Sequence, residues 1–248
     1  KTITIETLIE DRKVKISGFA KGSGMIYPNM ATMLAFLTCD VGIEKEDWDK
    51  MITIAVNKSF NAISVDGETS TNDSFIGINA GKKIDKKFLP TIQAGLDIVC
   101  QSLAKKIARD GEGANCLLEV LVKGTKNNLD AIKIAKSICN SSLVKTAIHG
   151  CDPNWGRIIS AAGNSGIDFN LYMVDLYIGE FQILKKGKLN KYDSEEVSNY
   201  MQTRMKGKYL VEDIVSIVLN LNLGNEKGMA WGCDLSKKYV EINSEYTT

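Results

Sequence analysis

The join between Ala31 and Thr32 is where residue types and spacing could support covalent chemistry in this sequence. It lies in KGSGMIYPNMATMLAFLTCD, residues 21–40, where a glycine-rich stretch broken by Pro28 precedes an apolar run typical of a buried strand. Glycines let the backbone adopt positive-φ conformations close to a reacting group. A threonine held there could attack its own preceding carbonyl, and the freed α-amine, with an ordinary pKa of about 7.7–8.0, could then act as general base. The pattern by itself still favours an ordinary loop entering the core, because Ala-Thr pairs before strands are common.

The other chemistry-bearing residues have plainer interpretations. His149 is the only histidine, so a histidine-based metal site is not expected and a Ser-His-Asp triad would rest on this residue alone. We predict a satisfied structural role for it, at the end of a strand. Lys21 precedes its neighbouring glycines and a strand follows them, whereas a phosphate-binding P-loop needs the lysine after the second glycine and then a helix. Nucleotide binding is therefore not predicted.

Two further stretches leave alternatives open. Glu112 stands between glycines after a long predicted helix; it is either a solvated helix-end carboxylate, which the spacing favours, or a ligand for an ammonium group. The final INSEYTT, residues 242–248, is either a frayed tail or a segment that folds back over a pocket. SVDGETSTND and CDPNWGR are rich in hydrogen-bonding groups, and turn scaffolding is the default interpretation of both.

The elements that must position these residues alternate between strand and helix patterns. Apolar alternation and β-branched runs predict strands over residues 2–8, 13–19, 32–40, 75–79, 115–124, 143–150, 171–179, 213–222 and 237–243. Helical spacing predicts helices over residues 45–63, 85–111, 128–141, 154–166 and 194–205. The fold class is therefore α+β, with mixed sheets covered by helices. No linker separates two independent domains.

Composition excludes several classes of protein. The chain has 248 residues, enough to bury one large core or two smaller ones, and its 31 basic and 30 acidic side chains give a net charge of +1. That balance argues against a nucleic-acid-binding surface, and no apolar run is long enough to span a membrane. The six cysteines form no CxxC pair and lack metal-ligand spacing. We predict that all six are free thiols and that no metal is bound.

Taken together, several stretches resemble a known family in order and spacing. GFAKGSGMIYPNMATMLAFLTCD, SVDGETSTNDS, ARDGEGA, HGCDPNWGRI and the terminal INSEYTT are similar to the ornithine acetyltransferases (glutamate N-acetyltransferases) of arginine biosynthesis, over the whole sequence. The resemblance implies the layered α/β sandwich of these self-cleaving enzymes. It also implies cleavage between Ala31 and Thr32, which would divide the sequence into 1–31, the end of an α chain, and 32–248, a β chain with an N-terminal nucleophile.

The resemblance also implies roles for individual residues. Thr32 matches the nucleophile that carries an acetyl group from N-acetylornithine to glutamate, and some family members use acetyl-CoA as donor as well; no cofactor is implied. Lys21 matches a lysine that contacts substrate, and Glu112 matches the carboxylate that engages the substrate's amino end. Asn243 and Thr248 match the C-terminal pair that closes the site. Lysine suits a substrate carboxylate and glutamate an ammonium group, as expected for amino-acid ligands.

The resemblance extends to partners and location. It implies a cytoplasmic α2β2 heterotetramer that binds N-acetylornithine and glutamate and neither nucleic acid nor membrane. This sequence matches from late in the family's α chain, so the groups that form the oxyanion hole and one further substrate contact would be supplied by a segment outside it. Two alternatives stay open: a related self-cleaving amidohydrolase or aminopeptidase, with water as the acyl acceptor, and an inactive truncated homologue.

Overall fold

The structure is a computed structural model that describes residues 1–27 and 33–245 of the chain. The chain forms two compact units, Lys1–Ile107 and Ala108–Thr248, which are described separately. Their boundary falls inside one helix, α2 (Leu89–Arg109), rather than in a linker. Ala31, Thr32 and Thr248 lie outside the described residues.

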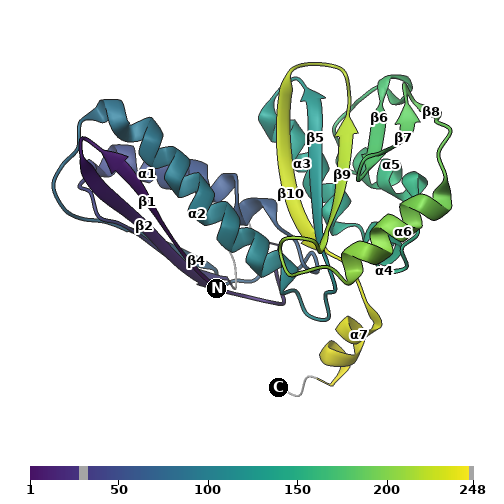
Figure 1. The fold of residues 1–248 in the computed structure, drawn as a ribbon, viewed down its shortest axis with the longest axis horizontal. Helices are drawn as coiled ribbons and strands as arrows, with labels where there is room; N and C mark the ends of the chain where they lie inside the picture. Colours follow the sequence, from purple (N-terminus) through teal and green to yellow (C-terminus); the bar gives the residue numbers. More distant parts are fainter. Residues whose placement is uncertain (28–32, 246–248) are drawn as a thin grey trace. The chain divides into compact units, whose positions relative to one another are not determined.

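The first unit contains a four-stranded sheet in the sequential order β1-β2-β3-β4 (Figure 1). Its strands are β1 (Thr2–Ile9), β2 (Arg12–Lys21), β3 (Leu34–Cys39) and β4 (Ser74–Asn79). The first three are antiparallel, and β3 and β4 are parallel. Glu10 and Asp11 both have positive φ, 49° and 61°, as expected for the tight turn of a β1–β2 hairpin.

Two helices, α1 (Lys45–Asn57) and α2, cover one face of this sheet. Alternate residues of β2 and β3 point to that face and are buried, among them Val14, Ile16 and Leu37. Glycine permits the close approach of α2: a Cβ at Gly18 would lie 2.9 Å from the side chains of Val99 and Leu103. Short 3-10 turns, Phe60–Ala62 and Lys86–Phe88, follow α1 and precede α2.

The second unit contains a six-stranded sheet in the order β10-β5-β9-β6-β7-β8. The strands are β5 (Leu117–Thr125), β6 (Asp175–Ile178), β7 (Phe181–Lys185), β8 (Lys188–Leu189), β9 (Ile214–Asn220) and β10 (Glu226–Cys233). The β5–β9 pair is parallel and the other pairs are antiparallel. Both units therefore contain a mixed sheet, as the predicted fold class requires.

The helices of the second unit are α3 (Asn128–Asn140), α4 (Ser142–His149), α5 (Trp155–Gly163), α6 (Ser194–Met205) and α7 (Lys237–Ser244), with a short 3-10 turn at Leu171–Met173. Helix α3 packs against β5 and β10 and also contacts α4 and α5. Its buried side chains, such as Ile134 and Ile138, join those of the central strands in one apolar core. Asn127 caps α3 by accepting a hydrogen bond from the amide of Asp130.

Two predicted strands are wrong, and three strands, β7, β8 and β10, were not predicted. Residues 143–150 are mostly helix α4, because Ser141 caps the amide of Val144 and the buried Val144, Ala147 and Ile148 share one helical face. Residues 237–243 lie in α7. Strand β10 escaped prediction because its glycines interrupt the apolar alternation; at Gly228 a Cβ would lie 2.6 Å from the amide of Ile132 in α3.

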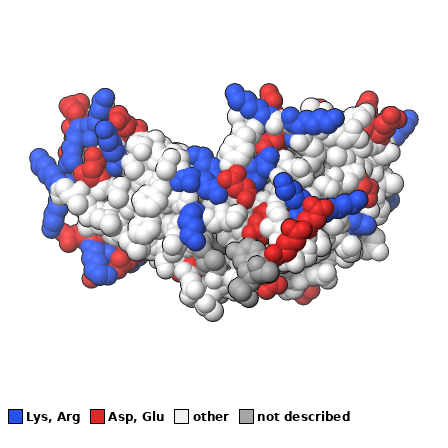
Figure 2. Space-filling view, turned by 90° about the horizontal axis from the view of Figure 1, so that it is seen from below, with Lys and Arg blue, Asp and Glu red and all other residues white. Residues whose placement is uncertain are grey.

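The surface carries basic and acidic side chains together, as the net charge of +1 indicates, and the cysteines are free thiols, as predicted. On the face shown in Figure 2, basic and acidic side chains lie side by side within the same clusters. All six cysteines are free and buried, and burial raises the pKa of the Cys100 thiol to about 12. Across residues 1–27 and 33–245, no helix combines the length and apolar character needed to cross a membrane.

Candidate functional site

Glu112 lies in the loop 110–116 that joins α2 to β5, and the start of this loop is firmly anchored. Arg109 forms an ion pair through Nε with the buried carboxylate of Asp213 and donates from Nη1 to the carbonyl of Ala114 at 3.2 Å. Tyr209 donates its hydroxyl proton to Asp110 at 2.7 Å. Burial and this hydrogen bond raise the pKa of Tyr209.

The end of the same loop is held by Asp234, whose side chain is fully buried. Its carboxylate accepts hydrogen bonds from the amides of Asn115 and Cys116, at 2.7 and 3.1 Å, and from the Asn115 side chain at 2.8 Å. Nδ1 of His149 lies 2.9 Å from the same carboxylate. The buried carboxylate is thus compensated from several directions, as burial of a charge requires.

The pairing with Asp234 gives His149 a partner of the kind expected for a structural histidine. The residue ends helix α4 rather than a strand, and its side chain is 38% exposed. Asp234 itself was missed by sequence reasoning, because it stands far from His149 in the chain and no local motif surrounds it. Within CDPNWGR, Asn154 caps helix α5 by accepting from the amide of Arg157, which is the predicted scaffolding role.

Helix α7 packs directly on the loop. Ser236 donates its hydroxyl proton to the carbonyl of Gly113 at 2.7 Å. Gly113 has φ of +72°, and a Cβ there would lie 2.7 Å from the amide of Tyr239, so glycine is required on both counts. One turn further, Nδ2 of Asn243 donates to Oε2 of Glu112 at 2.9 Å. Up to residue 245, therefore, the C-terminal segment folds back.

The described residues among those predicted to bind substrate are divided between the two units. Glu112 and Asn243 meet within the second unit. Lys21 ends strand β2 of the first unit, where it pairs with Leu34, two positions after Thr32. Ala31, Thr32 and Thr248 lie outside the described residues, so the positions of the proposed nucleophile and of the second C-terminal residue stay predictions.

The chain on either side of residues 28–32 is held by a segment whose predicted role was only turn scaffolding. Asp66 accepts from the amides of Met25 and Ile26, and Asp73 accepts from the amide of Met33. Both aspartates belong to SVDGETSTND. Sequence reasoning missed these contacts because a polar run indicates turns and does not show which backbone amides its carboxylates will bind.

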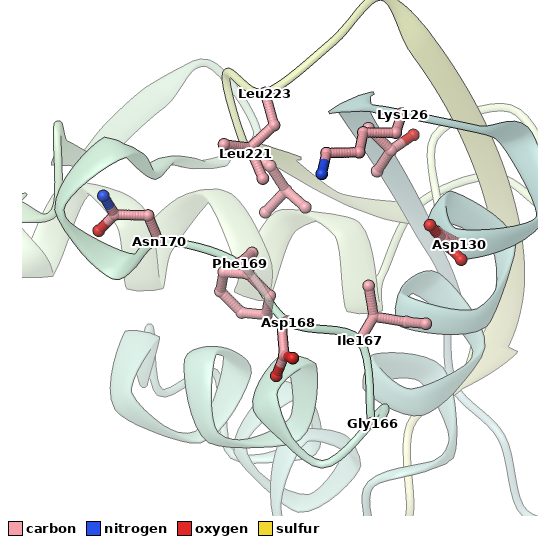
Figure 3. Close-up of a pocket in the computed structure, with 10 residues that line it drawn as sticks. Lys126, Asp130, Gly166, Ile167, Asp168, Phe169, Asn170, Leu221 and Leu223 are labelled. Carbon is pink, nitrogen blue, oxygen red and sulfur yellow. The ribbon is translucent and has the colours of Figure 1, made fainter.

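A separate cavity of about 570 Å³ opens in the second unit between the end of β5 and the 166–170 loop. In Figure 3 the Phe169 ring and the Lys126 side chain reach toward its middle, whereas the polar ends of Asp168 and Asn170 point away. The residues that line it include none of the predicted site residues. The cavity is therefore distinct from the Glu112–Asn243 pair.

Comparison with known proteins identifies the class of this chain. The ArgJ family model matches residues 1–248. Proteins named "Arginine biosynthesis bifunctional protein ArgJ" align with the whole chain: one from Prochlorococcus marinus subsp. pastoris is 86% identical over 248 residues, and one from Prochlorococcus marinus strain NATL2A is 52% identical over 248 residues. The chain spans 62% and 59% of the length of these curated relatives.

A solved structure supports the same assignment. The crystal structure of "Arginine biosynthesis bifunctional protein argJ" from Bacillus halodurans matches with a TM-score of 0.78 and 39% sequence identity. The match covers 87% of this chain and 100% of that chain. This protein belongs to the ArgJ family.

Proposed function

We propose that this protein, after cleaving itself between Ala31 and Thr32, transfers an acetyl group from N-acetylornithine to glutamate in arginine biosynthesis. Thr32 Oγ attacks the acetyl carbonyl of N-acetylornithine, the carbon–nitrogen bond breaks, and ornithine leaves with the proton. The amine of glutamate then attacks the acetyl-threonine ester and releases Thr32. The α-amine of the new N-terminus serves as the base that takes the hydroxyl proton.

The observation that carries the proposal is the meeting of Glu112 and Asn243. Two residues assigned to the substrate's amino end and to site closure, on resemblance alone, form a 2.9 Å hydrogen bond. The loop that carries Glu112 is fixed at both ends, by Arg109 and by Asp234. A carboxylate on such a loop can bind an ammonium group without first being ordered, which reduces the entropic cost of binding. The match of the family model to the whole chain supports the resemblance on which those assignments rest.

The remaining elements of the proposal rest on the family resemblance. Lys21 binds a substrate carboxylate, Thr248 helps to close the site, and acetyl-CoA is an additional donor. The protein works in the cytoplasm as an α2β2 heterotetramer, in which an α-chain segment supplies the oxyanion-hole donors. Such donors often make the largest single electrostatic contribution to acyl transfer.

An acyl-transfer assay distinguishes this function from its alternatives. The purified protein, with and without a co-expressed α-chain segment, is incubated with N-acetylornithine and glutamate, and both N-acetylglutamate and free acetate are quantified. We expect N-acetylglutamate as the main product. Acetate formed at the same rate whether or not glutamate is present would instead identify an amidohydrolase. Absence of both products, together with an uncut chain, would identify an inactive homologue.

A further inference from the structure

We infer that segment 64–74 (Ser64–Ser74), which we call the flank-binding segment, positions the Ala31–Thr32 bond for cleavage, with Asp66 and Asp73 as its positioning residues. The inference rests on the proposed function, because it concerns the cleavage that creates the nucleophile. It is carried by contacts among described residues on both sides of 28–32, all within the first unit.

The upstream flank is bound by consecutive residues of the segment. The amide of Val65 donates to the carbonyl of Ile26 at 2.7 Å. The two carboxylate oxygens of Asp66 accept from the amides of Met25 and Ile26, at 2.7 and 2.9 Å. Thr69 donates its hydroxyl proton to the carbonyl of Tyr27 at 3.0 Å. The backbone is thus held up to the last described residue before the cleavage site.

The downstream flank is bound by the other end of the same segment. Asp73 accepts a hydrogen bond from the amide of Met33, the residue directly after Thr32. The amide of Ser74 donates to the carbonyl of Met33 at 2.8 Å. From Leu34 onward the contact continues as the parallel pairing of β3 with β4, with Leu34 opposite Ser74. The first described residue after the cleavage site is therefore held on both its amide and its carbonyl.

The side chains of the two flanks are buried near the same glycine. Ile26 and Met33 are both fully buried. A Cβ at Gly22 would lie 3.0 Å from Cδ1 of Ile26 and 3.9 Å from Cβ of Met33. This point is one residue from Lys21, the proposed substrate contact. The two flanks are thus fixed close to one another and to Gly22, the residue that follows Lys21.

Backbone strain is present at the upstream flank. Met25 has φ of +52°, a conformation that costs a non-glycine residue energy and persists only where surrounding contacts impose it. The contact to the Met25 amide comes from Asp66. Segment 64–74 therefore holds the chain in a conformation that it would not adopt alone.

Anchoring on both sides has a direct consequence for cleavage. In that step Thr32 Oγ attacks the carbonyl carbon of Ala31, the Ala31–Thr32 carbon–nitrogen bond breaks, and water hydrolyses the resulting ester. An intramolecular attack gains rate when its reacting groups are confined to a productive geometry. Asp73 acts through the amide of Met33 and Asp66 through the amides of Met25 and Ile26, so neither needs to touch the reacting atoms.

The test measures the cleavage rate of purified precursor by intact mass, at a temperature well below unfolding. We compare wild type, Asp73→Ala, Asp73→Asn and Asp66→Ala with Asp40→Ala, in which the lost carboxylate accepts from the amide of Lys15 in the same sheet. We expect cleavage to slow about tenfold or more in Asp73→Ala and Asp66→Ala, the effect of losing hydrogen bonds to a charged acceptor. Asp73→Asn, which keeps one acceptor oxygen, should recover part of the rate, and Asp40→Ala should cleave like wild type.

Each outcome has a distinct meaning. Thermal unfolding of every variant shows whether cleavage follows positioning or merely stability. If the rates of all variants, Asp40→Ala included, follow their unfolding temperatures, the role is only structural and the inference is wrong. If wild type is cut and Asp73→Ala and Asp66→Ala are cut at the same rate, the inference alone fails. A wild type that is never cut contradicts the proposed function and the inference together.

Discussion

Asn243 donates a hydrogen bond to the carboxylate of Glu112 at 2.9 Å, across 131 positions of sequence. The contact joins the last turn of α7 to the loop between α2 and β5, and Ser236 makes a second connection between them through Gly113. The carboxylate that we assign to the substrate's amino end is therefore held by the C-terminal segment assigned to close the site.

Replacing Glu112 with Gln tests that assignment. The glutamine side chain can still accept a hydrogen bond from Asn243, but it lacks the negative charge that would bind an ammonium group. Binding of N-acetylornithine should weaken by about 1.5–3 kcal/mol, seen as a raised KM, while self-cleavage stays close to wild type. Glu241→Gln, an exposed change on the same α7 helix, is the matched control. Steady-state kinetics in which Glu112→Gln keeps both KM and kcat would remove Glu112 from the site.

Replacing Asp234 with Asn tests how the loop is held. In the wild type, N–H groups donate to the carboxylate oxygens of Asp234, but in the variant some of them would lie against the side-chain NH₂ group of Asn. The free energy of unfolding should therefore fall by about 3 kcal/mol. His149→Gln should cost about 1 kcal/mol, because Asp234 keeps its hydrogen bonds from Asn115 and Cys116. Urea unfolding at neutral pH measures both. If Asp234→Asn lowered the free energy of unfolding by no more than His149→Gln does, Asp234 would not be the residue that anchors the loop.

Lys136 on α3 makes stability depend on pH. Burial lowers the pKa of its ammonium group to about 8, from an ordinary 10.5. Between these two values the unfolded chain binds more protons, so this group makes stability rise with pH there, and its cost is fully present below pH 8. Lys136→Met should therefore stabilise the protein at pH 7, by at most about 3 kcal/mol.

The gain from Lys136→Met should shrink as the pH rises from 8 toward 10.5. Lys133→Met, an exposed change on the same helix, provides the control for loss of a positive charge. Urea unfolding of both variants at a series of pH values gives the comparison. A gain from Lys136→Met that is the same at pH 7 and pH 10 would show that the partly buried ammonium group is not its source.

Local patterns predicted most elements, and two of the failures, at β10 and α7, share one cause. The alternation in β2 identifies its buried face because Val14 and Ile16 are both buried and Ile16 lies against Gly95 of α2. In β10, Gly228 lets α3 approach and interrupts the alternation. Residues 237–243 resembled a strand, yet contacts to Gly113 and Glu112 place them in a helix against the loop. Short segments like these are determined by distant partners, which a local pattern does not contain.

The site was predictable only where the family resemblance named its residues. Glu112 and Asn243 were identified in this way, and the structure brings them together. Asp234, Asp66 and Asp73 were not, because each acts through backbone amides far from it in sequence. An aspartate that accepts hydrogen bonds from distant amides has the same local sequence context as one in a solvated turn.

The central claim is that Thr32 both cuts the chain and carries the acetyl group. It is tested most directly by intact and peptide-level mass spectrometry of wild type and Thr32→Ala, each incubated with N-acetylornithine alone. Wild type should give a chain beginning at Thr32 with one added acetyl group on that residue. Thr32→Ala should remain a single unacetylated chain, while Thr32→Ser, which keeps a hydroxyl, should still be cut, but more slowly. Normal cleavage of Thr32→Ala, or an acetyl group on any other residue, would contradict the account.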